Sequence, residues 1–241
     1  MRVILLLKMV ISEFESKIIE NKKLNSSVFS LKFSLPKNFS FFPGQYLSVS
    51  RITNGKKIRT PYTIASVPNK RYAEFIIKVV NIGKASHYLS KLKRGDKIEL
   101  FGPIGKFTIN NTSKENDLVF ISSGTGISPF ASMIPYLLEK GFKNKIILLN
   151  GFRNEKEILL NKEFLKLSKK YKNFEFHNIL SQPLKNFNDK GYVQDFLDKY
   201  VPDGFNGDYY LCGLKEMIEE VSKQLENKGV NKNRIFFEKY D

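Results

Sequence analysis

The first half of the chain alternates apolar and polar residues in short runs, of which Phe29, Leu31, Phe33 and Leu35 are an example. A period of two is typical of β-strands that bury one face. The pattern predicts an antiparallel β-barrel or sandwich over residues 18–109, interrupted by a short helix at residues 85–92. Turn-forming sequences separate the runs, at Pro43-Gly44, Asn54-Gly55, Arg94-Gly95-Asp96 and Gly102-Pro103.

The spacing of apolar residues changes after residues 110–116, which are polar and show no pattern of a helix or strand. We therefore expect two domains, a β-barrel over residues 1–112 and an α/β domain with a parallel sheet over residues 113–241. A helix with an apolar stripe at helical spacing is expected at residues 214–225. Apolar runs typical of strands buried on both faces occupy residues 118–121, 146–149, 174–179 and 209–211.

Composition excludes several kinds of cofactor. The 241 residues include one cysteine, Cys212, and two histidines, His87 and His177, which are too few to hold zinc, haem or an iron-sulfur cluster. No metal site is expected, and redox chemistry would need an organic cofactor. A single cysteine also forms no intrachain disulfide, which favours a reducing, cytoplasmic location.

The N-terminal residues 1–11 are apolar except for a few positions such as Lys8. This run is too short to span a membrane, and no small-residue cleavage site follows it. An extra strand or an over-long start is therefore preferred over a weak membrane anchor.

The chain carries 40 Lys and Arg residues against 24 Asp and Glu residues, a formal net charge of +16. This charge favours encounter with an acidic partner, such as a small acidic electron-carrier protein. Nucleic acid is disfavoured, because the sequence contains no basic run interleaved with aromatic residues and no nucleic-acid-binding motif. Lysines scattered over a solvated surface are the alternative that composition leaves open.

The strongest motif is Gly124-Thr125-Gly126-Ile127-Ser128-Pro129, which follows an apolar strand and opens a predicted helix. Glycines let the backbone turn tightly and approach a pyrophosphate, and the free amides at the start of a helix favour negative charge. Proline is compatible with the first helical turn, where no amide hydrogen is needed. The order of strand, glycine loop and helix predicts a nucleotide-phosphate site rather than an ordinary turn.

Two motifs in the barrel half indicate a flat cofactor that carries phosphate. In Arg59-Thr60-Pro61-Tyr62-Thr63-Ile64, an aromatic ring can lie along a planar ring system, a hydroxyl can bind its edge, and an arginine can pair with phosphate. The second motif, Gly83-Lys84-Ala85-Ser86, is a glycine-led loop into the predicted short helix. Taken alone, the first motif favours an ordinary strand whose Tyr62 and Ile64 fill the barrel, and the second motif is what changes this interpretation.

In this order, and followed by Gly102-Pro103-Ile104-Gly105-Lys106-Phe107, the motifs resemble the ferredoxin-NADP reductase superfamily. The resemblance runs from about Ser16 to Tyr240 and includes Pro43-Gly44-Gln45 and Gly151-Phe152-Arg153. It implies a flavoprotein oxidoreductase that contains FAD, uses NADP or NAD, and exchanges electrons with a one-electron carrier such as ferredoxin or flavodoxin.

The resemblance also implies roles for single residues. Tyr62 would lie on one face of the flavin and Tyr240 on the other, while Thr63, Cys212 and Glu238 would be the catalytic residues. The remaining FAD contacts would come from Arg59, Ile64, Gly83, Lys84, Ala85 and Ser86. The dinucleotide would contact Gly124, Thr125, Gly126, Ile127, Ser128, Pro129, Arg153, Ser181, Cys212 and Gly213.

Two departures from the family's pattern leave questions open. The family's arginine usually stands two positions before the tyrosine, but Thr60 occupies that place here and Arg59 lies one position further back. NADP-preferring members commonly have Ser-Arg where this chain has Ser181-Gln182, and glutamine forms no ion pair with a 2′-phosphate. Lys185 or Arg153 would have to replace that arginine, so NAD and NADP both stay open.

Three classes of function follow. The first is a ferredoxin or flavodoxin reductase, and the second is the reductase component of an oxygenase or an NAD(P)H-flavin reductase on the same fold. The third is a basic nucleic-acid-binding or purely structural protein without enzymatic activity. For single residues, a packing role for Cys212 and a frayed last strand at Tyr240 are the alternatives to the roles above. A yellow purified protein would exclude the third class.

Overall fold

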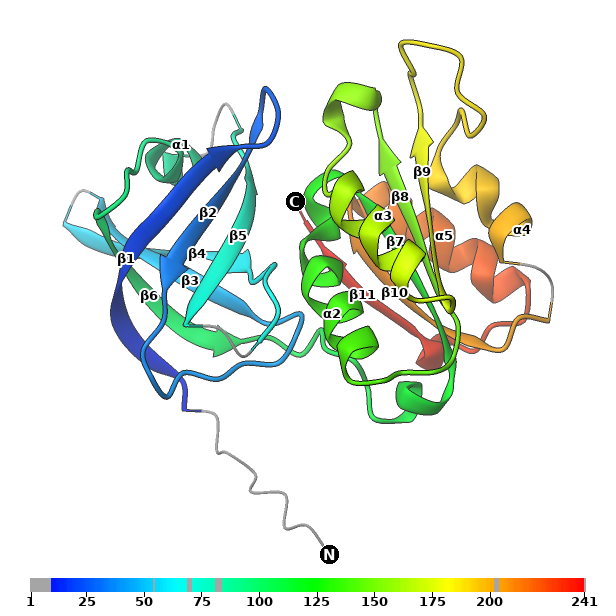
Figure 1. Ribbon diagram of the computed structural model, residues 1–241, viewed down its shortest axis with the longest axis horizontal. Helices are drawn as coiled ribbons and strands as arrows, with labels where there is room; N and C mark the ends of the chain where they lie inside the picture. The colour runs from blue at the N-terminus through cyan, green and yellow to red at the C-terminus, as the bar shows by residue number, and fades with distance from the viewer. Residues whose placement is uncertain (1–9, 54, 69–70, 81–83, 202–203, 241) are drawn as a thin grey trace, which may run out of the picture.

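The computed structural model describes residues 10–53, 55–68, 71–80, 84–201 and 204–240, which form two domains that lie side by side (Figure 1). Every strand pairing in the first domain is antiparallel, and the strand order is β4-β3-β6-β1-β2-β5. The predicted barrel is thus confirmed. Its elements are β1 (Ser12–Lys23), β2 (Val28–Ser34), β3 (Tyr46–Thr53), β4 (Lys56–Thr63), β5 (Tyr72–Lys78), α1 (Lys84–Ser90) and β6 (Lys97–Ile104).

The barrel core follows from the alternation in the sequence. Leu31, Phe33, Leu47, Val49 and Phe75 are all buried in one apolar cluster, because successive side chains of a strand point to opposite faces. The first strand begins at residue 12, earlier than the pattern suggested, and residues 1–9 lie outside the described part of the chain.

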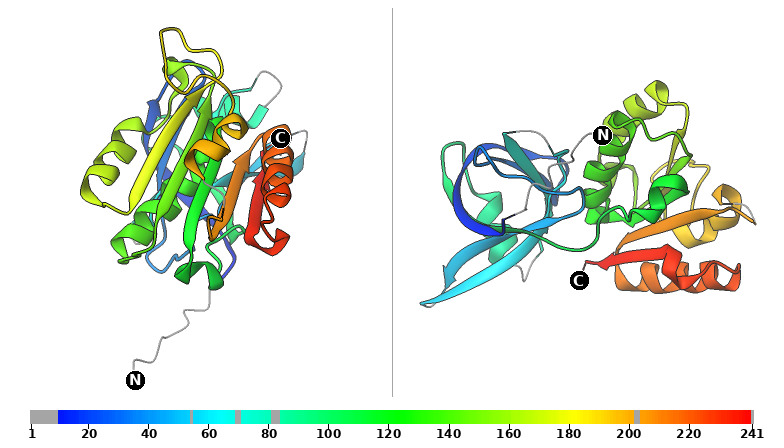
Figure 2. Two further views of the ribbon diagram at one scale, coloured as in Figure 1. Left: turned by 90° about the vertical axis from the view of Figure 1, so that its right-hand side faces the viewer. Right: turned by 90° about the horizontal axis from the view of Figure 1, so that it is seen from below.

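The second domain is a five-stranded parallel sheet in the order β11-β10-β7-β8-β9, again as predicted. Helices α2 and α3 cover one face and α4 and α5 the other (Figure 2). The strands are β7 (Asp117–Ser123), β8 (Ile146–Phe152), β9 (Phe174–Leu180), β10 (Gly207–Gly213) and β11 (Ile235–Lys239). The helices are α2 (Ser128–Glu139), α3 (Asn161–Lys170), α4 (Leu197–Tyr200) and α5 (Lys215–Asn227).

Helix α5 buries the predicted stripe of Met217, Ile218, Val221 and Leu225 against the sheet. The first residue of that predicted stripe, Leu214, is instead 60% exposed. The reason is that the helix begins one residue later, and Leu214 is an extended N-cap whose side chain no longer follows the helical period.

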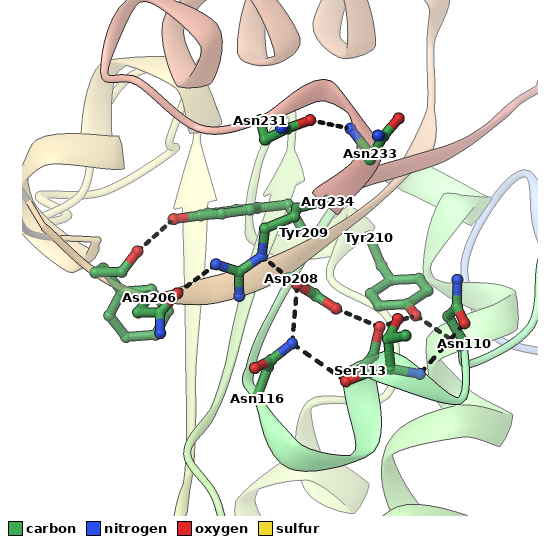
Figure 3. Close-up of polar contacts among 12 residues, drawn as sticks. Asn110, Ser113, Asn116, Asn206, Asp208, Tyr209, Tyr210, Asn231, Asn233 and Arg234 are labelled. Carbon is green, nitrogen blue, oxygen red and sulfur yellow. Dashed lines mark hydrogen bonds and ion pairs between the residues drawn. The ribbon is translucent and has the colours of Figure 1, made fainter.

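Residues 110–116, predicted to be structureless, contain the 3₁₀ helix Thr112–Glu115. Its Ser113 is fully buried, donates a hydrogen bond to Asp208 and accepts one of 2.9 Å from the Tyr210 hydroxyl (Figure 3). Arg234 Nε lies 2.6 Å from the same Asp208 carboxylate. The polar residues of this segment therefore belong to a hydrogen-bonded network at the start of β10 rather than to a flexible linker. The predicted domain limits of 1–112 and 113–241 stay a prediction.

The two domains share apolar packing and a polar contact. Ala65 and Phe107 of the barrel belong to the same buried cluster as Phe130 and Met133 of α2. The Ser132 hydroxyl donates a hydrogen bond of 2.7 Å to the Ser66 carbonyl. These contacts hold α2 against the barrel. No helix in the described part of the chain is both long and apolar enough to cross a membrane.

Candidate active site

Four side chains predicted to act in catalysis or to cover the cofactor meet between the domains. Cys212 and Glu238 are register partners at the carboxyl ends of the neighbouring strands β10 and β11. Thr63 ends strand β4 of the barrel, and Tyr240 follows β11, which points toward the barrel (Figure 2). The structure thus joins residues from both predicted domains in one cluster.

Hydrogen bonds connect this cluster across the domain boundary. The Tyr240 hydroxyl donates a hydrogen bond of 2.6 Å to Thr63 Oγ1, and the Thr63 hydroxyl donates one of 3.4 Å to Glu238 Oε2. The Tyr240 amide donates a bond of 2.9 Å to the Gly213 carbonyl. Because both its backbone and its side chain are held, Tyr240 is not the frayed end of a strand.

Burial raises the pKa values of the ionisable groups of the cluster. It raises the pKa of Glu238 to about 7, although the hydrogen bond from Thr63 opposes this shift. Burial, followed by the charge of Glu238, raises the pKa of the Cys212 thiol well above its usual value. The pKa of Tyr240 is raised by burial in the same way. Among these three groups, only Glu238 exchanges a proton near neutral pH.

Cys212 has no exposed surface and belongs to the core cluster beneath α2. The Tyr240 side chain packs against the same cluster and lowers the pKa of the thiol slightly, against the dominant effect of burial. Access to the thiol by a nicotinamide would therefore require the Tyr240 ring to move. Both the packing role and the predicted place beside the nicotinamide are compatible with this geometry, and the second stays a prediction.

The glycine loop follows β7 as expected, but it begins with a 3₁₀ turn, Gly124–Ile127, before α2. A Cβ atom on Gly126 would lie 2.2 Å from the Cys212 carbonyl oxygen, whereas one on Gly124, with a φ of 54°, would meet no atom of the described residues within 4 Å. The two glycines thus differ in purpose: Gly126 permits close packing on β10, and Gly124 permits the turn. Ile127, Ser128 and Pro129 are buried, so Gly124 and Thr125 are the most accessible part of the loop.

The ends of β8 and β9 bring the other predicted nucleotide contacts together. Arg153 Nε donates a hydrogen bond of 2.9 Å to Gln182 Oε1, and the amide of Ser181 donates one of 3.0 Å to the Phe152 carbonyl. The amides of Leu184 and Lys185 both bind the Glu155 carboxylate, and the first of these bonds lowers the pKa of Glu155. Glu155, which the sequence analysis did not identify, orders the segment that carries Lys185.

On the barrel side, Tyr62 and the residues of α1 form the predicted FAD region. Tyr62 is half-buried, its ring centroid is 5.6 Å from that of Phe75, and burial raises its pKa to about 12. Ile64 is a fully buried core residue. At the start of α1, Lys84 is exposed while Ala85 and Ser86 are buried. Gly83 lies outside the described residues.

Arg59 points away from this region. Its Nη2 lies 3.2 Å from Glu13 Oε1, and its guanidinium carbon lies 4.0 Å from the centroid of the Phe101 ring. Lys57 and then Arg59 lower the pKa of Glu13 to about 2 through their hydrogen bonds. The predicted phosphate contact of Arg59 stays a prediction, and it would require the side chain to leave these partners.

A different arginine, Arg51, lies near the predicted FAD region, and the motifs did not indicate it. Its Nη1 donates a hydrogen bond of 3.2 Å to the Lys84 carbonyl, while its Nε is buried and has no hydrogen-bond partner among the described residues. A buried cationic donor without a partner fits an anionic group such as the diphosphate of FAD. Together with the Tyr62 ring, it is the structural feature of the barrel that fits this cofactor.

Two family models match the chain, in agreement with its two sheets. The oxidoreductase FAD-binding domain matches residues 15–109, and the oxidoreductase NAD-binding domain matches residues 120–223. Among solved structures, a ferredoxin NADP⁺ reductase from Neisseria gonorrhoeae with bound FAD and NADP has a TM-score of 0.83, with coverage of 94% of this chain and 98% of that one, at 20% identity. The likeness to that structure supports the fold.

Curated relatives extend the similarity to sequence. NADH-cytochrome b5 reductase 1 of Dictyostelium discoideum is 30% identical over 232 residues, which are 93% of this chain and 79% of the relative. The reductase component DmpP of phenol 2-monooxygenase from Pseudomonas sp. strain CF600 is 31% identical over 227 residues, which are 90% of this chain but 62% of the relative. The chain therefore belongs to the ferredoxin-NADP reductase-like superfamily of oxidoreductases, with FAD and NAD or NADP as its cofactors.

Proposed function

We propose that this oxidoreductase passes electrons between NAD(P)H and a separate acidic one-electron carrier protein, such as ferredoxin or flavodoxin, in the cytoplasm. The observation that carries the proposal is the cluster of Thr63, Cys212, Glu238 and Tyr240, contributed by both domains. FAD, when bound, supplies the ability to accept electrons in pairs and release them singly. The net charge of +16 supports an acidic carrier, and an unpaired cysteine is compatible with a reducing compartment.

In this proposal, the protein's own groups hold the reactants and manage a proton. Thr63 Oγ1 accepts a hydrogen bond from Tyr240 and can donate one to Glu238, so the three side chains form a short relay. With a pKa of about 7, the Glu238 carboxyl can release or take up a proton at neutral pH. Cys212, held as a thiol, contributes a small apolar surface rather than a nucleophile.

Anaerobic stopped-flow measurements test the function directly. The bound flavin should be reduced by NADH or NADPH, and the reduced protein should then be reoxidised rapidly by ferredoxin or flavodoxin. Parallel titrations with the two nucleotides decide which one is preferred. A flavoprotein that reacts with neither nucleotide, or one that reoxidises only with oxygen, would contradict the proposed electron transfer.

The reductase component of an oxygenase is a second candidate, and the 31% identity to the phenol 2-monooxygenase component favours it specifically. In that case a partner oxygenase component, rather than a ferredoxin or flavodoxin, would be the fast acceptor. An NAD(P)H-flavin reductase would instead pass electrons to free flavin. Reoxidation rates with the three acceptors, measured under the same conditions, separate these functions.

A further inference from the structure

Arg51 is a half-buried arginine on β3 with an incomplete set of partners. An arginine side chain is cationic at any physiological pH and carries five N–H donors. Within the part of the chain that the structure describes, the Nε of Arg51 is buried with no hydrogen-bond partner, while its Nη1 donates a hydrogen bond to the carbonyl of Lys84. Desolvating a donor of a charged group without a replacement acceptor costs free energy, so an acceptor from a ligand is expected at this position.

The position of Arg51 in the hairpin places it on the same face as Tyr62. In the antiparallel register of β3 and β4, Leu47 pairs with Tyr62, Val49 with Thr60, and Arg51 with Ile58. Alternate residues of a strand share a face, so all these side chains lie on the face that contains the buried Leu47 and Val49. Consistent with this arrangement, the positive charge of Arg51 acts to lower the pKa of Tyr62 against the dominant effect of burial.

Arg59 lies on the opposite face of the same hairpin. It is an odd number of residues from both Thr60 and Tyr62, so the pleat directs it outward, toward Glu13 and the Phe101 ring. Thr60, which stands where the family usually has its arginine, faces the same side as Tyr62 but carries no charge. The inner face of the hairpin therefore has a cation at residue 51, whereas positions 58, 60 and 62 of β4, which pair with residues 51, 49 and 47, carry none.

We propose that Arg51, rather than Arg59, pairs with the diphosphate of FAD in this protein. The guanidinium suits a phosphate because it offers paired donors in a planar fork. Its bond to the Lys84 carbonyl fixes it beside the α1 region where the motif Gly83 to Ser86 predicts a diphosphate contact. In this chain the phosphate-binding arginine would thus have moved from β4 to the neighbouring strand, on the same face. The inference rests on FAD binding.

The test compares Arg51→Gln with the matched control Arg59→Gln in the full-length chain. FAD content is measured in the purified proteins, and FAD affinity is measured by reconstitution of the deflavinated chains, followed by flavin fluorescence. Loss of a charge-assisted hydrogen bond of about 1.5–3 kcal/mol corresponds to about a tenfold to 150-fold weaker affinity for FAD in Arg51→Gln. Arg59→Gln should change the affinity by less than about threefold, and Arg51→Lys should retain part of the affinity because it keeps the charge.

Riboflavin, which has no phosphate, separates a phosphate contact from a role in folding. Arg51→Gln should bind riboflavin as the unchanged protein does, and its melting temperature without flavin should be the same. Equal losses for FAD and riboflavin, or a loss of FAD confined to Arg59→Gln, would overturn the assignment of Arg51. If the unchanged protein bound no FAD at all, the flavin-dependent function would fail together with this inference.

Discussion

The hydroxyl of Tyr240 donates a hydrogen bond of 2.6 Å to the hydroxyl oxygen of Thr63, although 177 positions separate the two residues in the chain. The bond joins the end of the last strand of the α/β domain to the end of β4 in the barrel. Thr63 is buried and lies within hydrogen-bond reach of Glu238 as well. Any molecule that reaches Cys212 from the barrel side must therefore displace or share this contact.

Replacing Tyr240 by serine should strengthen the binding of NAD(P)⁺. When the tyrosine covers the nucleotide position, only the molecules in which it has moved aside can bind NAD(P)⁺. The apparent dissociation constant for NAD(P)⁺ is then raised by the inverse of that open fraction, on the order of tenfold when a tenth of the molecules are open. Titration with NAD⁺ or NADP⁺, followed by the absorbance of the bound flavin, measures the change. Tyr240→Phe keeps the ring and should stay close to the unchanged protein; equal affinity in all three proteins would contradict the covering role.

Replacing Glu238 by glutamine should change how stability depends on pH. The pKa of Glu238 is about 7 in the folded protein and 4.5 in its ordinary state, so between these values the folded state binds more protons than the unfolded state. The contribution of Glu238 to the free energy of unfolding is therefore fully present below about pH 4.5 and is lost as the pH rises through 7.

Melting temperatures measured from pH 5 to pH 8 check this sign. The unchanged protein should lose stability relative to Glu238→Gln over this interval, while Glu216→Gln, an exposed change on α5, should leave the profile as it is. Parallel profiles for the unchanged protein and Glu238→Gln would refute the raised pKa.

Alanine at the two glycines of the loop that is predicted to bind the nucleotide should have different effects. At Gly126, the added Cβ would collide with the backbone of Cys212, so a loss of about 1–3 kcal/mol in stability is expected together with slower flavin reduction by NAD(P)H. At Gly124, the space is open and only the positive φ is unfavourable, at a cost of about 1 kcal/mol. Chemical denaturation and stopped-flow reduction of both variants test the difference, and FAD content should stay normal in each. A Gly126→Ala protein as stable as Gly124→Ala would rule out the packing described for this loop.

The single cysteine offers an unambiguous probe of burial. Because Cys212 has no exposed surface and its thiol stays protonated at neutral pH, a thiol reagent should react far more slowly with the folded protein than with the protein in denaturant. Removal of the neighbouring ring in Tyr240→Ser should accelerate the reaction. A folded chain that is labelled as fast as the denatured one would show that the site is open.

Electron transfer to an acidic carrier should depend strongly on salt. Attraction between opposite charges is screened over about 8 Å at physiological ionic strength, so the association rate should fall as salt is raised from about 0.05 to 0.5 M. Reduction of a neutral small acceptor in the same buffers should stay nearly constant. If the rate of carrier reduction did not change with salt, the net charge of +16 would reflect only solvated surface lysines and arginines. The oxygenase-component or free-flavin function would then be favoured.

The local pattern of residues was sufficient to predict both sheets and the order of strand, loop and helix in the second domain. Alternation with a period of two is typical of strands in a sheet that buries one face, whereas continuous apolar runs are typical of strands covered on both faces. The barrel and the parallel sheet therefore follow from the local pattern. The order of strand, glycine loop and helix at Gly124 was likewise predicted correctly, because short-range backbone geometry limits which residues can occupy such a turn.

Tertiary structure alone decided which residues meet and which face each one takes. The partnership of Thr63 with Tyr240 depends on how the domains pack, and no local pattern records a contact across 177 positions. The sequence shows that Arg59 is offset by one residue from the family's arginine. Which face of the hairpin Arg59 and Arg51 take depends on the pleat and the register of β3 and β4. In this structure Arg59 lies on the outer face, against Glu13, and Arg51 lies on the inner face with Tyr62. The sequence shows which chemical groups each residue carries, whereas long-range packing determines which other residues those groups contact.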